Sequence, residues 1–234
     1  MAGVESPDAT SSTRTVERAL ALVSAISEQD GATLTQLADA TDLSPSTASR
    51  LLGTLVQLGF TERDADNRYR PGRRLKQIAA VTLREEPLYE LAGPALHALA
   101  DETGETASLA IPVDDERALY LRQVAGHHRV QTANWTGRTI PRDGTAIGAA
   151  LAGEVDDRGV AATRVTVEPD ITAIAAPVVD RHGTVVGAVN VIAPTYRTSD
   201  EDVAAYGAAL VRHAARVSAL LGAPSPTDPQ EPSR

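Results

Sequence analysis

The sequence predicts an α+β protein of two domains, a helical N-terminal one and a C-terminal one built on an antiparallel sheet. The chain has 234 residues, which is enough for two separate cores. Apolar residues recur at helical spacing as far as Arg74, whereas β-branched runs typical of strands begin after Glu105. Charge is also uneven: residues 44–76 contain seven Arg or Lys and three Asp or Glu, although the net charge is -9. A local basic surface on an acidic chain is typical of a nucleic-acid-binding domain joined to another domain.

Composition argues against several classes of protein. No run of about 18 apolar residues is present, so we expect no membrane span and no membrane partner. The polar N-terminus lacks the apolar stretch of a secretory signal. The chain has no cysteine, which excludes disulfides and thiolate metal sites. These features predict a cytoplasmic protein.

The first domain is predicted to span residues 13–76, after a disordered tail at residues 1–12. Helix one is indicated by apolar residues at helical spacing, and Gly31 is expected to end it. Thr35 is expected to cap a short second helix that runs through Ala40 and packs Leu37 and Ala38 inward. The apolar positions of helix one are Val16, Leu20, Leu22, Val23 and Ile26.

The third helix is predicted to begin at Pro45 and to end at Gly59. Ser44 is a favourable N-cap, and Pro45 occupies the first helical position, where its missing N–H is not needed. The predicted core face comprises Ala48, Leu51, Leu52, Leu55, Val56 and Leu58. Residues 60–70 then read as a short hairpin, which makes the domain a winged helix-turn-helix.

Polar residues on the early, outward turns of this third helix suit contacts with double-stranded DNA. Hydroxyl groups and arginines bond to base edges and phosphates, and the start of a recognition helix enters the major groove. Arginines of the wing can reach the DNA backbone. The predicted DNA contacts are Ser44, Ser46, Thr47, Ser49, Arg50, Arg68 and Arg70. The alternative is a packing module, because winged helices also mediate protein contacts.

The second domain is predicted to span residues 105–221, after a helical linker and first helix at residues 77–104. Proline at position 87 interrupts the helical stretch. The expected strands are residues 106–113, 117–124, 129–134, 171–179 and 185–192. Residues 144–152 and 200–220 are expected to be helical, the latter with Val203, Tyr206, Leu210, Val217 and Leu220 on one face. A second disordered tail is predicted at residues 222–234.

Short motifs along the whole chain make it resemble the IclR family of bacterial and archaeal regulators. In the first domain they are Thr15–Leu20, Leu34–Ala38, Leu43–Leu52, Thr54–Leu55 and Arg68–Gly72. In the second they are Gly104–Leu109, Gly137–Pro141, Gly144–Gly148, Ile174–Val178 and Gly183–Pro194. The resemblance implies a winged helix-turn-helix, a helical linker and a GAF-like antiparallel-sheet effector domain. It also implies a homodimer or dimer of dimers on palindromic operator DNA, and repression as the commoner outcome.

The resemblance further implies a cleft that binds a small organic effector, acidic or aromatic. Carried over by position, the effector-binding residues are Ala146, Ile147, Thr163, Ala173, Asn190 and Ile192. Asn190 interrupts an apolar strand, so its amide needs a partner, either a ligand or a hydrogen bond between strands. Trp135, the only tryptophan, is added as a residue that either stacks on the ligand or packs under its loop.

The chain departs from the family pattern after Ala152, where several helical turns of typical members are missing. We therefore expect a smaller or more apolar pocket, and keep a ligand-independent DNA-binding or protein-interaction module with a vestigial effector domain as the alternative.

An enzyme is not expected. The adjacent His127 and His128 point to opposite faces of a strand, and the other histidines lie in separate elements. Nucleophile-elbow, zinc-protease and phosphate-loop motifs are absent from the sequence. We expect no catalytic residues, no metal and no cofactor.

Overall fold

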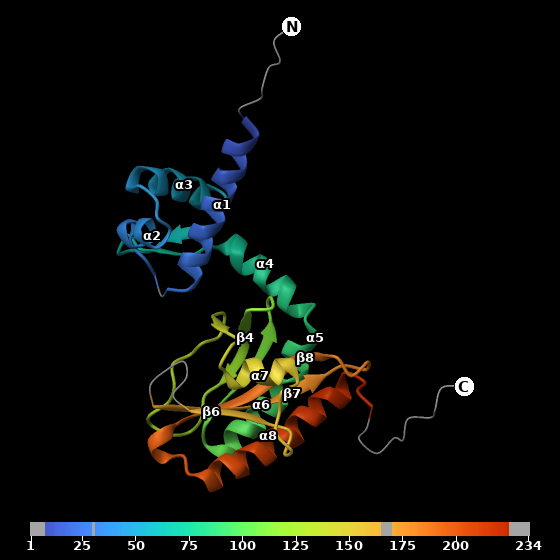
Figure 1. The fold of residues 1–234 in the computed structure, drawn as a ribbon. Coiled ribbons are helices and arrows are strands. Elements are labelled where there is room, and N and C mark those ends of the chain that lie inside the picture. Colours follow the sequence, from blue (N-terminus) through green and yellow to red (C-terminus); the bar gives the residue numbers. More distant parts are fainter. Residues whose placement is uncertain (1–7, 30, 165–169, 225–234) are drawn as a thin grey trace, which may run out of the picture. The chain divides into compact units, whose positions relative to one another are not determined.

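The computed structural model describes residues 8–29, 31–164 and 170–224 of the chain. It divides into two compact units, Met1–Glu85 and Glu86–Arg234. Both units combine helices with antiparallel strands, so the predicted α+β class is confirmed (Figure 1). Among the described residues, no helix combines the length and apolarity needed to cross a membrane.

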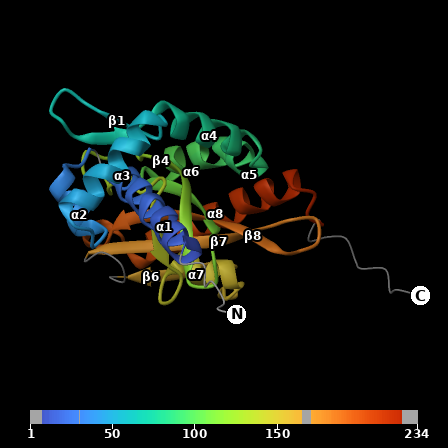
Figure 2. The ribbon, with the colours of Figure 1, turned by 90° about the horizontal axis from the view of Figure 1, so that it is seen from above.

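The first unit is a winged helix-turn-helix. Its elements are α1 (Asp8–Ser27), α2 (Leu34–Ala40), α3 (Pro45–Gln57), β1 (Thr61–Arg63), β2 (Tyr69–Pro71) and α4 (Arg73–Arg84). Strands β1 and β2 pair as the wing, and β1 contacts both α3 and α4 (Figure 2). The core lies between α1, α2, α3 and β2, with Leu22, Ile26, Leu37, Leu52 and Tyr69 buried at its centre.

Three boundaries in this unit differ between the sequence prediction and the structure: the start of α1, the cap of α2 and the end of the domain. Helix α1 begins at Asp8, so residues 8–12 of the predicted tail are helical, and residues 1–7 lie outside the described part. Apolar spacing detects only the packed part of a helix, which polar residues extend through backbone hydrogen bonds. Thr33, not Thr35, caps α2, because Gln36 three residues later completes a capping box with it. Helix α4 begins at Arg73, so the boundary predicted after Lys76 falls inside a helix.

Two residues predicted for the core face of α3, and two of the apolar residues that indicated α1, are exposed. Val16 and Leu20 of α1 are 56% and 60% exposed. On α3, Val56 and the capping residue Leu58 are also exposed. Each helix packs through one stripe against its neighbours, and these side chains lie off that stripe. The remaining core positions of α3, Ala48, Leu51, Leu52 and Leu55, are buried.

The second unit is a six-stranded antiparallel sheet with helices on both faces. The helices are α5 (Pro87–Leu91), α6 (Gly93–Thr103), α7 (Ala146–Ala152) and α8 (Asp200–Leu220), with a 3-10 turn η1 (Thr195–Arg197). The strands are β3 (Thr106–Pro112), β4 (Arg117–Val124), β5 (Thr139–Pro141), β6 (Ala161–Arg164), β7 (Ile171–Val179) and β8 (Val185–Pro194). Their order in the sheet is β5-β4-β3-β8-β7-β6.

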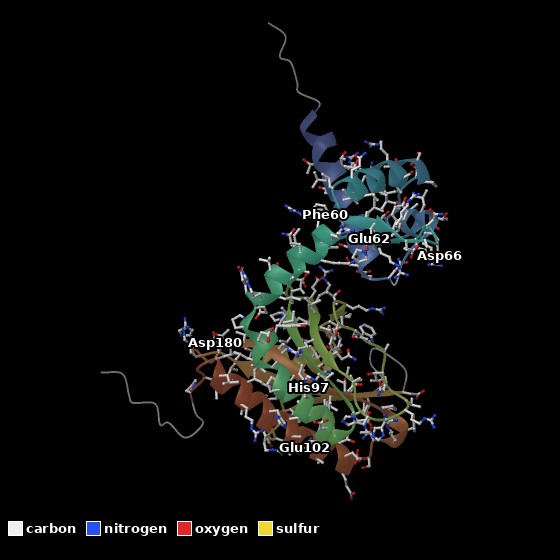
Figure 3. All side chains as sticks on the ribbon, turned by 180° about the vertical axis from the view of Figure 1, so that it is seen from behind. Phe60, Glu62, Asp66, His97, Glu102 and Asp180 are labelled. Carbon is white, nitrogen blue, oxygen red and sulfur yellow. The ribbon has the colours of Figure 1, made fainter. Side chains whose placement is uncertain are left out.

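Alternating side chains of the sheet face different helices. Ala173 and Ile192, which pair across β7 and β8, face α7 together with Ile147. Ala176, three residues along β7, lies with Val211 on the α8 side. Helices α6 and α8 contact each other, and Glu102 of α6 bonds to Arg212 and His213 of α8 (Figure 3).

The structure changes several details of this unit. Residues 129–134, expected as a strand, form none, because the Gln123 side chain binds Ala133 and Trp135 in place of a strand ladder. Strands β5 and β6 had not been expected; each is short and lies at an edge of the sheet. Leu220 is exposed rather than part of the packed face of α8. Of the tail predicted at residues 222–234, only 222–224 are described, and they turn back onto the end of α8.

Candidate DNA-binding surface and effector pocket

The start of α3 is fixed by a cluster of three hydroxyl groups. The Ser44 hydroxyl accepts a hydrogen bond from the Thr47 amide nitrogen at 3.3 Å. It also lies 2.9 Å from the Thr47 hydroxyl and 3.2 Å from the Ser46 hydroxyl. This cap, with Pro45 at the first position, holds the first turn rigidly at the surface.

The predicted recognition residues share the outward face of α3. Ser44, Ser46, Ser49 and Arg50 are exposed and Thr47 is half-buried, whereas Ala48 on the other face is fully buried. The first two turns of the helix therefore present short donors and one guanidinium to solvent, as reading base edges requires.

The turn of the wing is organised by Asp64. Its carboxylate accepts hydrogen bonds from the backbone nitrogens of Asp66 and Arg68, at 3.0 and 2.9 Å, and from Arg70 Nε at 2.7 Å. The Arg70 guanidinium, helped by the Arg68 amide, holds the pKa of Asp64 below its ordinary value. Arg68 donates to the Gly31 carbonyl at 2.9 Å. Both predicted wing arginines are therefore anchored within the domain, with further N–H donors on each guanidinium.

The other basic side chains of residues 60–76 differ in whether they are paired with groups of the domain. Arg63 donates to the Tyr69 hydroxyl and stacks over its ring. Lys76 pairs with Glu62 of β1, which Figure 3 labels. Arg73 and Arg74 at the start of α4 are exposed and have no ion pair with any described residue. Sequence reasoning counted these two among the local charges but did not select them as contacts, although the Arg-Arg pair was the available signal.

The second unit contains a small cavity between the sheet and α7. Its volume is about 50 Å³, enough for a few water molecules or part of a small ligand. Six of the seven predicted effector residues line it: Trp135, Ala146, Ile147, Thr163, Ala173 and Ile192. Tyr120, Thr132, Ile140, Thr145 and Ile171 complete the wall, and sequence reasoning missed them. They come from β4, the loop before β5, β5 itself, the N-cap of α7 and β7, which only the folded chain brings together.

Helix α7 is placed against the cavity by its N-terminal residues. The Thr145 hydroxyl accepts from the Gly148 nitrogen at 3.0 Å and donates to the Pro141 or Arg142 carbonyl. A Cβ atom at Gly148 would lie 1.7 Å from the Arg142 carbonyl oxygen. Glycine is therefore required at this position for the helix to approach the preceding loop.

The loop at residues 125–138 forms one wall of the cavity and is tied down on both sides. Arg197 forms a two-point ion pair with the buried Glu105, with both N–O distances 2.8 Å, and donates to the Val130 carbonyl at 3.0 Å. These bonds to Glu105 raise the pKa of Arg197. On the other side, Gln123 accepts from the Trp135 nitrogen at 2.9 Å. The Trp135 ring packs on Tyr120 at 6.0 Å between centroids.

Asn190 is the one predicted effector residue that does not line the cavity. It is fully buried on β8, opposite Ser108 on β3 and Ala175 on β7. Neither its amide atoms nor the Ser108 hydroxyl has a hydrogen-bond partner among the described residues. The bond between strands, one of the two alternatives for Asn190, is therefore not formed among the described residues. The side chain lies one pleat beyond Ile192 on the same face of the sheet.

The described residues contain no group of three His, Cys, Asp or Glu placed to hold a metal ion. Histidines 127 and 128 instead approach single carboxylates, those of Asp101 and Glu105.

The fold and these two sites define a winged-helix regulator with a sensor domain. The chain belongs to the IclR family of transcriptional regulators. The model described as the IclR helix-turn-helix domain matches residues 15–65. The model described as the bacterial transcriptional regulator IclR C-terminal domain matches residues 80–158 and 153–219, two pieces that overlap just after α7.

Individual proteins agree with the family match. The chain is 28% identical to the HTH-type transcriptional regulator BhcR of Paracoccus denitrificans, over 88% of this chain and 86% of that protein. It is 24% identical to the transcriptional repressor IclR of Escherichia coli, over 94% of both. The crystal structure of an IclR homologue from Microbacterium hydrocarbonoxydans, complexed with 4-hydroxybenzoate, has the same fold. That comparison has a TM-score of 0.72 at 19% identity and covers 88% of this chain and 98% of the other.

Proposed function

We propose that this family member binds double-stranded operator DNA sequence-specifically through α3 and acts as a repressor controlled by a small organic effector. The observation that carries the DNA-binding part is the capped, exposed first turn of α3, with Ser46, Ser49 and Arg50 facing away from the core. A rigid helix start with outward hydroxyl and guanidinium donors matches the requirements of major-groove reading.

The proposed contacts divide into two kinds. Ser44, Ser46, Thr47, Ser49 and Arg50 lie at the groove, whereas Arg68 and Arg70 contact phosphates from the wing. Asp64 and the Gly31 carbonyl hold those two arginines in fixed positions, which lowers the entropy that each would lose on binding. Arg73 and Arg74 are added as phosphate contacts because they are exposed and have no described ion pair.

Selection from a random DNA library with the full-length chain tests this interface. We expect an enriched palindromic sequence and, for Arg50→Ala, a loss of about 1–3 kcal/mol in binding free energy at the preferred site. Arg73→Ala should lower the salt slope of binding by about one unit with little change in sequence preference, because it removes one phosphate contact.

Arg158→Ala is a matched control, because Arg158 is paired with Asp156 in the other unit. Unchanged sequence preference and affinity in Arg50→Ala would mean that α3 does not read the DNA.

The effector part of the proposal is supported by the cavity at α7, where six of the predicted residues meet. The homologue with 4-hydroxybenzoate shows that this fold accommodates a small ligand, and the proposal transfers that property to this chain. Trp135 is the only tryptophan and lines the cavity, so its fluorescence reports on binding there. We expect a saturable fluorescence change with at least one member of a small-molecule library, and weaker DNA binding when that compound is present.

The alternative is a ligand-independent DNA-binding or protein-interaction module, favoured by the small size of the cavity. A flat fluorescence response across the library, with DNA binding intact, would favour it. In either case we propose a regulator rather than an enzyme, acting in the cytoplasm where its DNA is accessible.

We further propose a homodimer, or a dimer of dimers, as the DNA-binding form. Val16 and Leu20 of α1, and Ile78 and Val81 of α4, are exposed apolar side chains spaced along helices of the first unit. None of the residues of α4 is buried, although the helix is amphipathic. A second copy of the chain would cover such stripes and would present two recognition helices to a palindrome.

A further inference from the structure

The wall of the effector cavity carries no charged side chain among the described residues. Its lining consists of aromatic and aliphatic residues together with three threonines. Arg164, which follows Thr163 on β6, is exposed, pairs with Asp200 and is not part of the lining. An anion inside this cavity would therefore lack a cationic partner from its wall.

A carboxylate would lose more than it gained in such a site. Removing an ionised group from water without a counter-charge is strongly unfavourable. Helix α7 has only seven residues, so its dipole is small, and the Thr145 hydroxyl already bonds to the Gly148 N–H in its first turn. Because the cavity offers little to offset the desolvation of a carboxylate, it favours an uncharged ligand.

One buried hydroxyl in the wall, that of Thr132, is available for a ligand. The Thr145 hydroxyl is used in capping α7, whereas the Thr132 hydroxyl oxygen is buried and has no hydrogen-bond partner among the described residues. Thr132 lies in the loop that Arg197 holds through the Val130 carbonyl. Its position is therefore fixed, and a hydroxyl can both donate to a carbonyl and accept from an amide or alcohol.

Arg138 is a cation that lies outside the lining but close to Trp135, which is part of it. Its guanidinium carbon is 5.8 Å from the centroid of the Trp135 ring. An anion that bound Arg138 would lie at this ring, and would depend on that single exposed arginine.

We infer that the effector of this chain is an uncharged small molecule with a flat apolar body and one amide, alcohol or phenol group that bonds to Thr132. The inference rests on the proposed function of the cavity as the effector site. The inferred effector differs in charge from the ligand of the homologue bound to 4-hydroxybenzoate, which carries a carboxylate.

Matched pairs of compounds that differ only in charge test the inference. The full-length chain is titrated at neutral pH with benzamide and benzoate, 4-hydroxybenzamide and 4-hydroxybenzoate, and isobutyramide and isobutyrate. Trp135 fluorescence and the thermal midpoint are followed. We expect an aromatic amide to bind at least about tenfold more tightly than its carboxylate partner, a difference of about 1.4 kcal/mol.

Two variants locate the contact. Thr132→Val keeps the shape of the side chain and should weaken amide binding by about three- to tenfold, the effect of one neutral hydrogen bond. Arg138→Met should leave amide binding unchanged. The thermal midpoint of each variant without ligand controls for misfolding.

Two results would overturn the inference, and they are distinguishable. Carboxylates that bind as tightly as the amides, with binding lost in Arg138→Met, would refute an uncharged effector while leaving the effector site in place. If none of the six compounds changed the fluorescence or the midpoint while a charged compound of the library did, the inference would fail and the effector site would remain; a flat response across the whole library would remove the effector role as well.

Discussion

At the scale of single residues, two buried polar side chains close to the cavity at α7 stand out. Asn190 and Ser108 face each other across β8 and β3, are fully buried, and have no hydrogen-bond partner among the described residues. A buried unpaired amide costs about 1–3 kcal/mol of stability. The sheet therefore contains a local destabilisation next to the pocket, as is common where function constrains a sequence.

Replacing Asn190→Leu should stabilise the protein. Leucine has the same branching at Cγ as asparagine, although it is larger, and it removes two unpaired polar atoms, so we expect the free energy of unfolding to rise by about 1–2 kcal/mol. Thermal unfolding of the full-length chain measures this, with Ser108→Ala as the matched variant on the facing strand. A fall in the thermal midpoint of Asn190→Leu would show that the amide makes a stabilising bond after all.

At the scale of elements, the wing depends on one carboxylate. Asp64 receives two backbone N–H groups and the Arg70 side chain, and these bonds lower its pKa from the ordinary value of 3.8. A carboxyl group with a lowered pKa stabilises the folded state above its unfolded pKa, and this contribution is lost as the pH falls through the folded pKa. The wing should therefore remain ordered at neutral pH and loosen only in acid.

Hydrogen exchange at the Arg68 amide tests this dependence. In Asp64→Asn, we expect this amide to exchange several-fold faster than in the unmodified chain at neutral pH. The difference should persist as the pH is lowered to about 3.8 and vanish below the folded pKa of Asp64. Asp66→Asn serves as the control, because its side chain has no described bond within the turn. Equal exchange in Asp64→Asn and the unmodified chain at neutral pH would contradict the role of Asp64.

At the scale of the whole molecule, exposed apolar residues of the first unit bear on assembly. Val16 and Leu20 lie one helical turn apart on α1 and are more than half exposed. Such side chains are commonly covered by a partner when they recur along a helix. The proposed homodimer assigns them that role.

The double variant Val16→Glu, Leu20→Glu should raise the dimer dissociation constant at least about tenfold, because it places charge on a desolvated interface. Sedimentation equilibrium measures the change, and binding to a palindromic site should weaken in parallel. Val113→Glu is the control, since Val113 is similarly exposed in a turn of the other unit. A double variant that sediments like the unmodified chain would place the dimer contact elsewhere.

Much of the fold follows from local signals in the sequence. The cap and proline at Ser44 and Pro45 determine the start of α3, since these interactions involve residues three or four apart. The β7–β8 hairpin is equally local, with Gly183 at a φ of +75° in its turn. The alternation of apolar residues then fixes which face of each strand is buried.

The details of both sites were decided by tertiary structure. Thr132 and Tyr120 reach the cavity only because β4 pairs with β5 and the loop between them is tied to Gln123 and Arg197. The partners of the wing arginines, and the missing partner of Asn190, depend likewise on groups distant in sequence. The sequence alone determined the start of α3 and the order of the domains, because helix caps, turns and periodicity are short-range. The chemistry of the pocket depends on strand register and loop anchoring, which only the folded chain specifies.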